Sequence, residues 1–174
     1  QRQQATRKEA KPLITNCAAN LFYPKRLAAR ITKGCMMKIS VLGAGAWGTA
    51  LAMAFAQKHQ VTLWTRHDDH ASAMQSTRQN EAYLPKLMFP EALTISADFA
   101  ACLTADLVIV ATPMNGLRPT LQRITSLTQR DVPLLWVCKG VEQETACLPH
   151  QIVAEVCPHW TQYGVLSGPS FALE

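Results

Sequence analysis

Three glycines spaced as G-x-G-x-x-G constrain this sequence more than any other feature. Gly43, Gly45 and Gly48 follow an apolar run, residues 38–42, and precede an uninterrupted helix-forming run, residues 49–58. After a strand and at the start of a helix, each glycine has its own steric task. The first permits a tight turn, the second lets the backbone approach a pyrophosphate, and the third lets the helix pack closely on the sheet. The unpaired N–H groups at the helix start would then face the phosphates.

The spacing of the glycines alone is weak evidence, because protein kinases carry a similar glycine loop. A kinase loop joins two antiparallel strands, whereas a helix-forming run follows the glycines here. A glycine-rich turn between strand and helix that binds no ligand is the alternative interpretation. We favour a dinucleotide-binding turn.

The sequence after residue 35 alternates between strand-like and helix-like segments. Strands are predicted at residues 38–42, 61–65, 93–96, 106–111, 133–138 and 163–167. Helices are predicted at residues 46–58, 68–77, 98–104, 116–128 and 145–157. Strands that alternate with helices form a parallel sheet that is covered on both faces. We therefore expect an α/β fold, a Rossmann-like, doubly wound, mainly parallel sheet, over residues 36–174.

Residues 1–35 differ from the rest of the chain in charge. They hold eight Lys and Arg residues against one acid, whereas the remaining 139 residues hold nine basic and eleven acidic groups. The net charge of +5 therefore belongs to this extension and does not indicate nucleic-acid binding by the body of the protein. Met36 and Met37 offer a natural start, so we interpret residues 1–35 as a non-native leader or a disordered segment. A targeting segment and a basic interaction arm are the alternatives.

Metal, disulfide and membrane functions find no support in the sequence. The six cysteines include no C-x-x-C pair, and the five histidines form no Cys/His cluster. We therefore expect reduced cysteines and no metal site. No apolar run approaches the roughly 20 residues of a membrane span. We expect a cytoplasmic protein with no nucleic-acid partner and no membrane span.

The end of the second predicted strand carries Arg66 and His67 where NAD-selective sites usually carry an acid. The planar fork of an arginine suits the 2′-phosphate of NADP. Asp68 and Asp69 follow, so use of NAD stays open, and a solvated loop cation is the alternative interpretation of Arg66. We expect NADP or NAD as cofactor, with NADPH favoured.

Three further loop segments follow predicted strands, namely Thr112-Pro113, Lys139-Gly140 and the sequence SGPSFA at 167–172. The loops at the carboxyl ends of parallel strands gather around one crevice, where ligands bind. These segments should therefore converge with the glycine turn. Lys139 would supply a cation suited to an anionic substrate, and the alternative is a surface lysine at a strand end.

In their order and spacing, the motifs of this chain resemble the amino-terminal half of bacterial NAD(P)-dependent glycerol-3-phosphate dehydrogenases. The motifs are GAGAWGTALA, LWTR, NEAYLP, VATP, WVCKG and SGPSFALE, and the resemblance covers residues 36–174. It implies reversible hydride transfer between NAD(P)H and dihydroxyacetone phosphate, which gives sn-glycerol 3-phosphate for glycerophospholipid synthesis. It also implies an all-helical second domain beyond Glu174 that carries the acid/base lysine. We therefore expect no catalytic residue in this chain and no turnover by the chain alone; a homodimer is compatible with the resemblance.

The resemblance also implies roles for individual residues. It assigns to the cofactor Gly43, Gly45, Ala46, Trp47, Gly48, Arg66, His67, Lys139 and Ala172. It assigns to the substrate Lys139, Gly168 and Ser170. Ala46 stands where the family often has a hydroxyl residue, which removes one side-chain contact to phosphate but leaves the backbone N–H. Packing at the first helical turn is the alternative role of Trp47.

Two other functions are compatible with the sequence. One is a stand-alone NAD(P)-binding module without turnover. The other is a different dehydrogenase of similar architecture, such as a ketopantoate reductase or a sugar dehydrogenase. The motifs SGPSFA and KG at their spacing argue against the second alternative.

Overall fold

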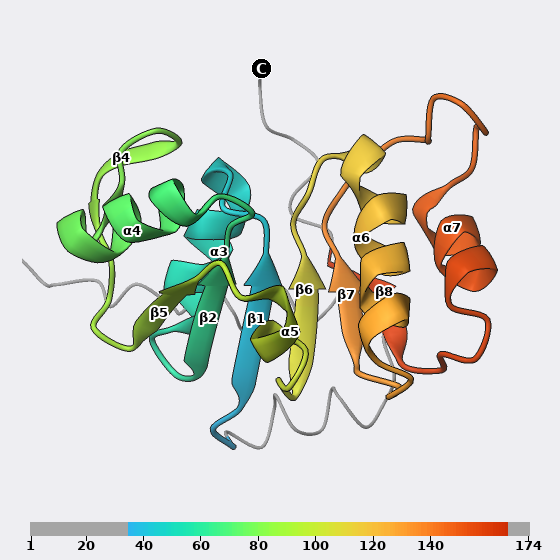
Figure 1. Cartoon of the computed structure of the whole chain (residues 1–174), viewed down its shortest axis with the longest axis horizontal. Coiled ribbons are helices and arrows are strands. Elements are labelled where there is room, and N and C mark those ends of the chain that lie inside the picture. The colour runs from blue at the N-terminus through green and yellow to red at the C-terminus, as the bar shows by residue number, and fades with distance from the viewer. Residues whose placement is uncertain (1–34, 167–174) are drawn as a thin grey trace, which may run out of the picture.

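A six-stranded parallel sheet forms the centre of the computed structural model, which describes residues 35–166 (Figure 1). Its strands are β1 (Lys38–Leu42), β2 (Gln60–Trp64), β5 (Leu93–Ser96), β6 (Leu107–Val110), β7 (Leu134–Trp136) and β8 (Tyr163–Val165). They lie in the order β5-β2-β1-β6-β7-β8, and all five neighbouring pairs are parallel. This is the strand order of a dinucleotide-binding doubly wound fold, so the predicted fold class is confirmed.

The helices follow the strands as the alternating sequence pattern predicts. They are α3 (Ala46–Phe55), α4 (Asp68–Thr77), α5 (Phe99–Cys102), α6 (Met114–Leu127) and α7 (Pro149–Val156). The helix predicted from residue 145 begins only at Pro149. Proline fits the first turn of a helix but disfavours helical geometry in the residue before it, and Leu148 is extended with ψ 155°.

A small antiparallel hairpin, β3 (Gln79–Asn80) with β4 (Leu84–Met88), was not predicted. The sequence of β4, LPKLM, shows no alternation of apolar and polar residues, and four of its five residues are exposed. The strand also contains Pro85, which lowers its strand propensity. In Figure 1 β4 lies at the upper left, next to α4.

Strand residues alternate between two hydrophobic clusters, one on each face of the sheet. In β6, Leu107 and Ile109 belong to one cluster and Val108 and Val110 to the other, and none is more than 1% exposed. Buried residues of α3 and α4 join the first cluster, and those of α5, α6 and α7 join the second. Figure 1 shows α5 and α6 in front of the sheet. The sheet is therefore covered on both faces, as predicted for parallel strands.

The first and third glycines bring α3 and the end of β6 into close contact. Gly43 has a φ of +124°, and a Cβ there would lie 2.6 Å from the carbonyl oxygen of Ala111. A Cβ at Gly48 would overlap the carbonyl oxygen of Gly43 and lie 3.0 Å from Cβ of Ala111. Gly43 therefore requires glycine for its positive φ in the turn, and Gly48 requires it for packing, as the sequence predicts for each.

We predict that Gly48→Ala destabilises the fold by about 1–3 kcal/mol, because its Cβ has no room beside the backbone. Gly45→Ala is the matched control, because a Cβ at Gly45 would meet nothing within 4 Å. Urea unfolding followed by circular dichroism measures both free energies of unfolding. Equal losses in the two variants would contradict the packing role of Gly48.

Candidate dinucleotide-binding site

The glycine turn lies where the strand order of the sheet reverses. The chain passes from β1 to β2 and β5 on one side, and from β6 to β7 and β8 on the other. Ligands of open α/β sheets bind at this point, outside the carboxyl ends of the strands. The N–H of Gly43 donates to the carbonyl of Trp64 at 3.1 Å, which joins the turn to the end of β2.

The N-terminus of α3 presents free N–H groups to this crevice. Its N-cap, Gly45, is extended with φ −73° and ψ 179°, and no side chain caps the helix. The N–H of Thr49 bonds to the carbonyl of Gly45 at 2.9 Å, so the helical ladder leaves the N–H groups of residues 46–48 without helical partners. The first turn carries no acidic side chain. Such an N-terminus is suited to an anion.

Open space beside Gly45 fits the approach of a phosphate group. A Cβ at this position would meet nothing within 4 Å, so packing within residues 35–166 does not explain a glycine there. Ala46 and Trp47 are exposed at the same turn, with Trp47 at 50%. The residues present therefore fit a pyrophosphate at the helix N-terminus.

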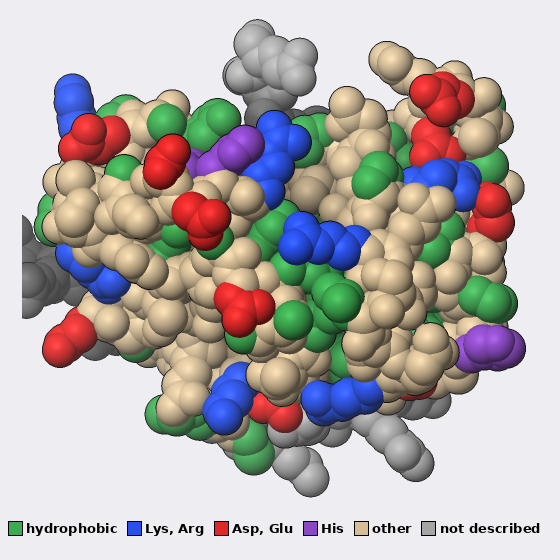
Figure 2. All heavy atoms as spheres, viewed as in Figure 1, with side chains coloured by type: hydrophobic (Ala, Val, Ile, Leu, Met, Phe, Trp, Pro, Cys, Tyr) green, Lys and Arg blue, Asp and Glu red, His purple; other side chains and the backbone are tan. Residues whose placement is uncertain are grey.

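Arg66 and His67 lie together at the end of β2, and both are exposed. The Nε of Arg66 donates to Nε2 of His67 at 2.9 Å. Within residues 35–166 this is the one side-chain hydrogen bond of Arg66, so its two terminal nitrogens can still donate to an anion. Figure 2 shows a histidine side chain beside Lys or Arg side chains at the upper edge of the molecule, in the same view as Figure 1.

Thr112 follows β6 and lies beside the glycine turn, as predicted. A Cβ at Gly43 would be 3.3 Å from the backbone nitrogen of Thr112. The hydroxyl of Thr112 is buried and has no hydrogen-bond partner in the part of the chain that the structure describes. Pro113 is the N-cap of α6, so a second helix begins at this edge.

Lys139 follows β7 and is exposed. The N–H of Val137 donates to the carbonyl of Val110 at 3.1 Å, which aligns the end of β7 with the end of β6. Gly140 has a φ of +95°, so the chain turns sharply directly after the lysine. Lys139 therefore belongs to the same edge of the sheet as the glycine turn.

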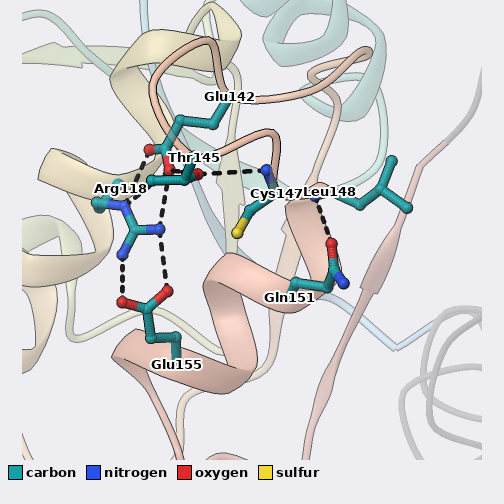
Figure 3. A network of polar contacts seen from close by, with 7 residues as sticks. All are labelled: Arg118, Glu142, Thr145, Cys147, Leu148, Gln151 and Glu155. Carbon is teal, nitrogen blue, oxygen red and sulfur yellow. Dashed lines mark hydrogen bonds and ion pairs between the residues drawn. The ribbon is translucent and has the colours of Figure 1, made fainter.

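An ion-pair network anchors the loop that follows Lys139 (Figure 3). Arg118 in α6 donates from Nε and Nη2 to the Glu142 carboxylate at 2.8–3.0 Å, and its Nη1 lies 2.9 Å from Glu155 Oε1 in α7. The hydroxyl of Thr145 also donates to Glu142. Bonds from Arg118 and then Thr145 lower the pKa of the Glu142 carboxyl. The loop is therefore tied to both helices.

The role of Arg118 was not predicted from the sequence. Its partners are 24 and 37 residues away in sequence, so no local spacing signals the contact. Asn80 was also missed as an individual residue, although it begins the quoted motif NEAYLP. It is fully buried, and its side chain bonds to the glycine turn.

Three predicted site residues, Gly168, Ser170 and Ala172, lie outside the described residues, as does most of the extension 1–35. Among residues 35–166, the side chains of His, Cys, Asp and Glu form no group of three or more that could hold a metal ion. No helix within that range has the length and apolar character to cross a membrane. The five cysteines within that range are free thiols.

Comparison with known proteins identifies one family. The sequence profile described as "NAD-dependent glycerol-3-phosphate dehydrogenase N-terminus" matches residues 38–174. The NAD(P)+ glycerol-3-phosphate dehydrogenase of Aromatoleum aromaticum is 52% identical over 139 residues, which cover 79% of this chain and 42% of that protein. The protein of the same name from Dechloromonas aromatica is 50% identical over equal shares. The chain thus spans less than half the length of these relatives.

Solved structures agree with the sequence matches. Glycerol-3-phosphate dehydrogenase from Coxiella burnetii superposes with a TM-score of 0.69 and 32% identity, over 78% of this chain and 42% of that chain. The glycerol-3-phosphate dehydrogenase of Saccharomyces cerevisiae has a TM-score of 0.66 over 79% of this chain and 43% of that chain. Its 21% identity shows the shared fold alone. This chain therefore belongs to the NAD-dependent glycerol-3-phosphate dehydrogenase family and matches its N-terminal region.

Proposed function

We propose that this chain is the cofactor-binding part of an NAD(P)-dependent glycerol-3-phosphate dehydrogenase. The observation that carries the proposal is the uncapped N-terminus of α3, with open space beside Gly45 at the point where the strand order reverses. The names of the relatives support the reaction. Because the chain spans 42% of the relative from A. aromaticum, we propose the reaction for the whole enzyme to which this region contributes.

Each part of the site holds one part of the cofactor in this proposal. The N–H groups of residues 46–48 donate to the pyrophosphate, and the dipole of α3 favours its negative charge. The terminal nitrogens of Arg66 donate to the 2′-phosphate of NADPH while Nε stays on His67. When bound, the nicotinamide would supply the hydride to the carbonyl carbon of dihydroxyacetone phosphate. The proton that completes sn-glycerol 3-phosphate would come from the acid/base lysine that the resemblance places outside residues 36–174.

Lys139 contributes a cation for the substrate and the cofactor. Its ammonium is exposed at the edge where the glycine turn lies, and the Arg118 network fixes the loop that follows it. A fixed loop holds the ammonium in the position that hydride transfer requires.

On the strength of the resemblance we also assign Gly168 and Ser170 to the substrate and Ala172 to the cofactor. We also propose a cytoplasmic location, on the ground of the unpaired cysteines in the sequence, and the resemblance is compatible with a homodimer of the complete enzyme.

We predict that Arg66→Asp weakens NADPH binding on the order of tenfold to a hundredfold, because a charge-assisted bond to phosphate is lost. The Kd for NADH should change much less. Arg130→Asp is the control, since it makes the same charge change at an exposed arginine on the opposite edge of the sheet. Fluorescence titration of the chain gives the Kd values. Equal NADPH affinities in the Arg66→Asp and Arg130→Asp variants would exclude the assignment.

A second prediction concerns Lys139 in a complete enzyme, obtained by joining residues 36–174 to the remainder of the A. aromaticum relative. Lys139→Ala should lower kcat/KM for dihydroxyacetone phosphate at least tenfold, or about 1.4 kcal/mol, because the substrate loses its cation. Lys58→Ala removes an exposed lysine at the opposite edge and should change little. A Lys139→Ala enzyme that melts normally and stays within twofold of the parent would make Lys139 a solvated surface lysine.

A further inference from the structure

We propose that Asn80 is a positioning residue that couples the two phosphate-binding parts of the cofactor site. Its side chain holds the glycine turn on one side and, through His70, the end of β2 on the other. This inference rests on the proposed cofactor site. It assigns a task to a residue that touches neither the pyrophosphate nor the 2′-phosphate position.

One arm of the network fixes the glycine turn. Asn80 Nδ2 donates to the carbonyl of Ala44 at 2.9 Å and to the hydroxyl of Thr49 at 2.8 Å. Ala44 lies between the first two glycines, and Thr49 lies in the first turn of α3. A single amide group thus sets the turn relative to the helix whose N–H groups face the crevice.

The other arm leads to Arg66. Asn80 Oδ1 lies 3.3 Å from Nε2 of His70, and Nδ1 of His70 lies 3.1 Å from the hydroxyl of Thr65. The carbonyl of Ala44 can only accept, so the amide nitrogen of Asn80 must face it and Oδ1 must face His70. Nε2 of His70 therefore carries the proton, and Nδ1 accepts from Thr65, the residue before Arg66.

Burial makes this network sensitive to the loss of the Asn80 amide. Asn80 and Thr49 are fully buried and Thr65 is 5% exposed. Removal of the Asn80 amide leaves the carbonyl of Ala44 and the hydroxyl of Thr49 without that partner, away from water. Asparagine supplies two donors and one acceptor, a set that aspartate cannot supply. The turn can then regain partners by moving, and such a movement displaces the N–H groups that face the crevice.

The two arms predict different outcomes for two variants. Asn80→Ala cuts both arms, so the Kd values of NADPH and NADH should each rise at least tenfold, and the preference for NADPH over NADH should fall at least threefold. His70→Ala cuts only the arm to β2, so the Kd of NADPH should rise while that of NADH stays within twofold. A loss of stability alone would change neither the preference nor the difference between the variants.

The test is a fluorescence titration of the 174-residue chain with NADPH and NADH, with the melting temperature measured by circular dichroism. Gln75→Ala is the matched control, because it removes an amide-to-carbonyl bond from α4 to Ile95 that does not touch the glycine turn. Both Kd values should stay within twofold in this control. If Asn80→Ala does not fold, His70→Ala and Gln75→Ala decide the question, because His70 is only half-buried.

Three results would overturn the proposal. The first is Kd values within twofold of the parent in Asn80→Ala with a lowered melting temperature, which would make Asn80 purely structural. The second is a rise of both Kd values with an unchanged NADPH preference, which would exclude the arm to β2. The third is an NADPH Kd within twofold of the parent in His70→Ala. A parent chain that binds neither nucleotide would instead contradict the proposed function.

Discussion

The contact between the glycine turn and the end of β6 is the constraint on which the rest of the site depends. Two glycines, 43 and 48, leave room for the backbone of Ala111 and for the start of α3. Helix α3 can therefore begin at the carboxyl ends of β1 and β6, where the strand order reverses. A side chain at either glycine would push the helix away and move its N–H groups out of the crevice. The same turn therefore determines both the packing of α3 on the sheet and the position of its N–H groups.

Around this turn, polar networks hold the groups that phosphates would bind. Asn80 and His70 connect the turn to the end of β2, where Arg66 lies. Arg118 connects α6 to the loop after Lys139. Each network links elements distant in sequence through polar side chains that belong to neither hydrophobic cluster. The clusters determine the sheet, and the networks determine the geometry of its carboxyl edge.

The sequence was sufficient to predict the sheet and the central turn, because these depend on local patterns. Glycine spacing and apolar runs identify β1, α3 and β6 without reference to distant residues. The start of α7 was misplaced because the restriction that Pro149 imposes was not weighed against the helical pattern. The hairpin at residues 79–88 and the partners of Asn80 were missed because they depend on contacts across the fold. Ala44 lies 36 residues from Asn80, and no spacing rule connects them.

In the proposed function, the N–H groups at the start of α3 hold the cofactor's pyrophosphate. Two-dimensional amide NMR of the chain during titration with NADPH tests this most directly. We predict that the amide resonances of residues 46–48 shift with the bound fraction. The amide resonances of Lys38 and Gln60, which lie at the opposite edge of the sheet, should not shift. NADPH binding that leaves the resonances of residues 46–48 unchanged would contradict this role.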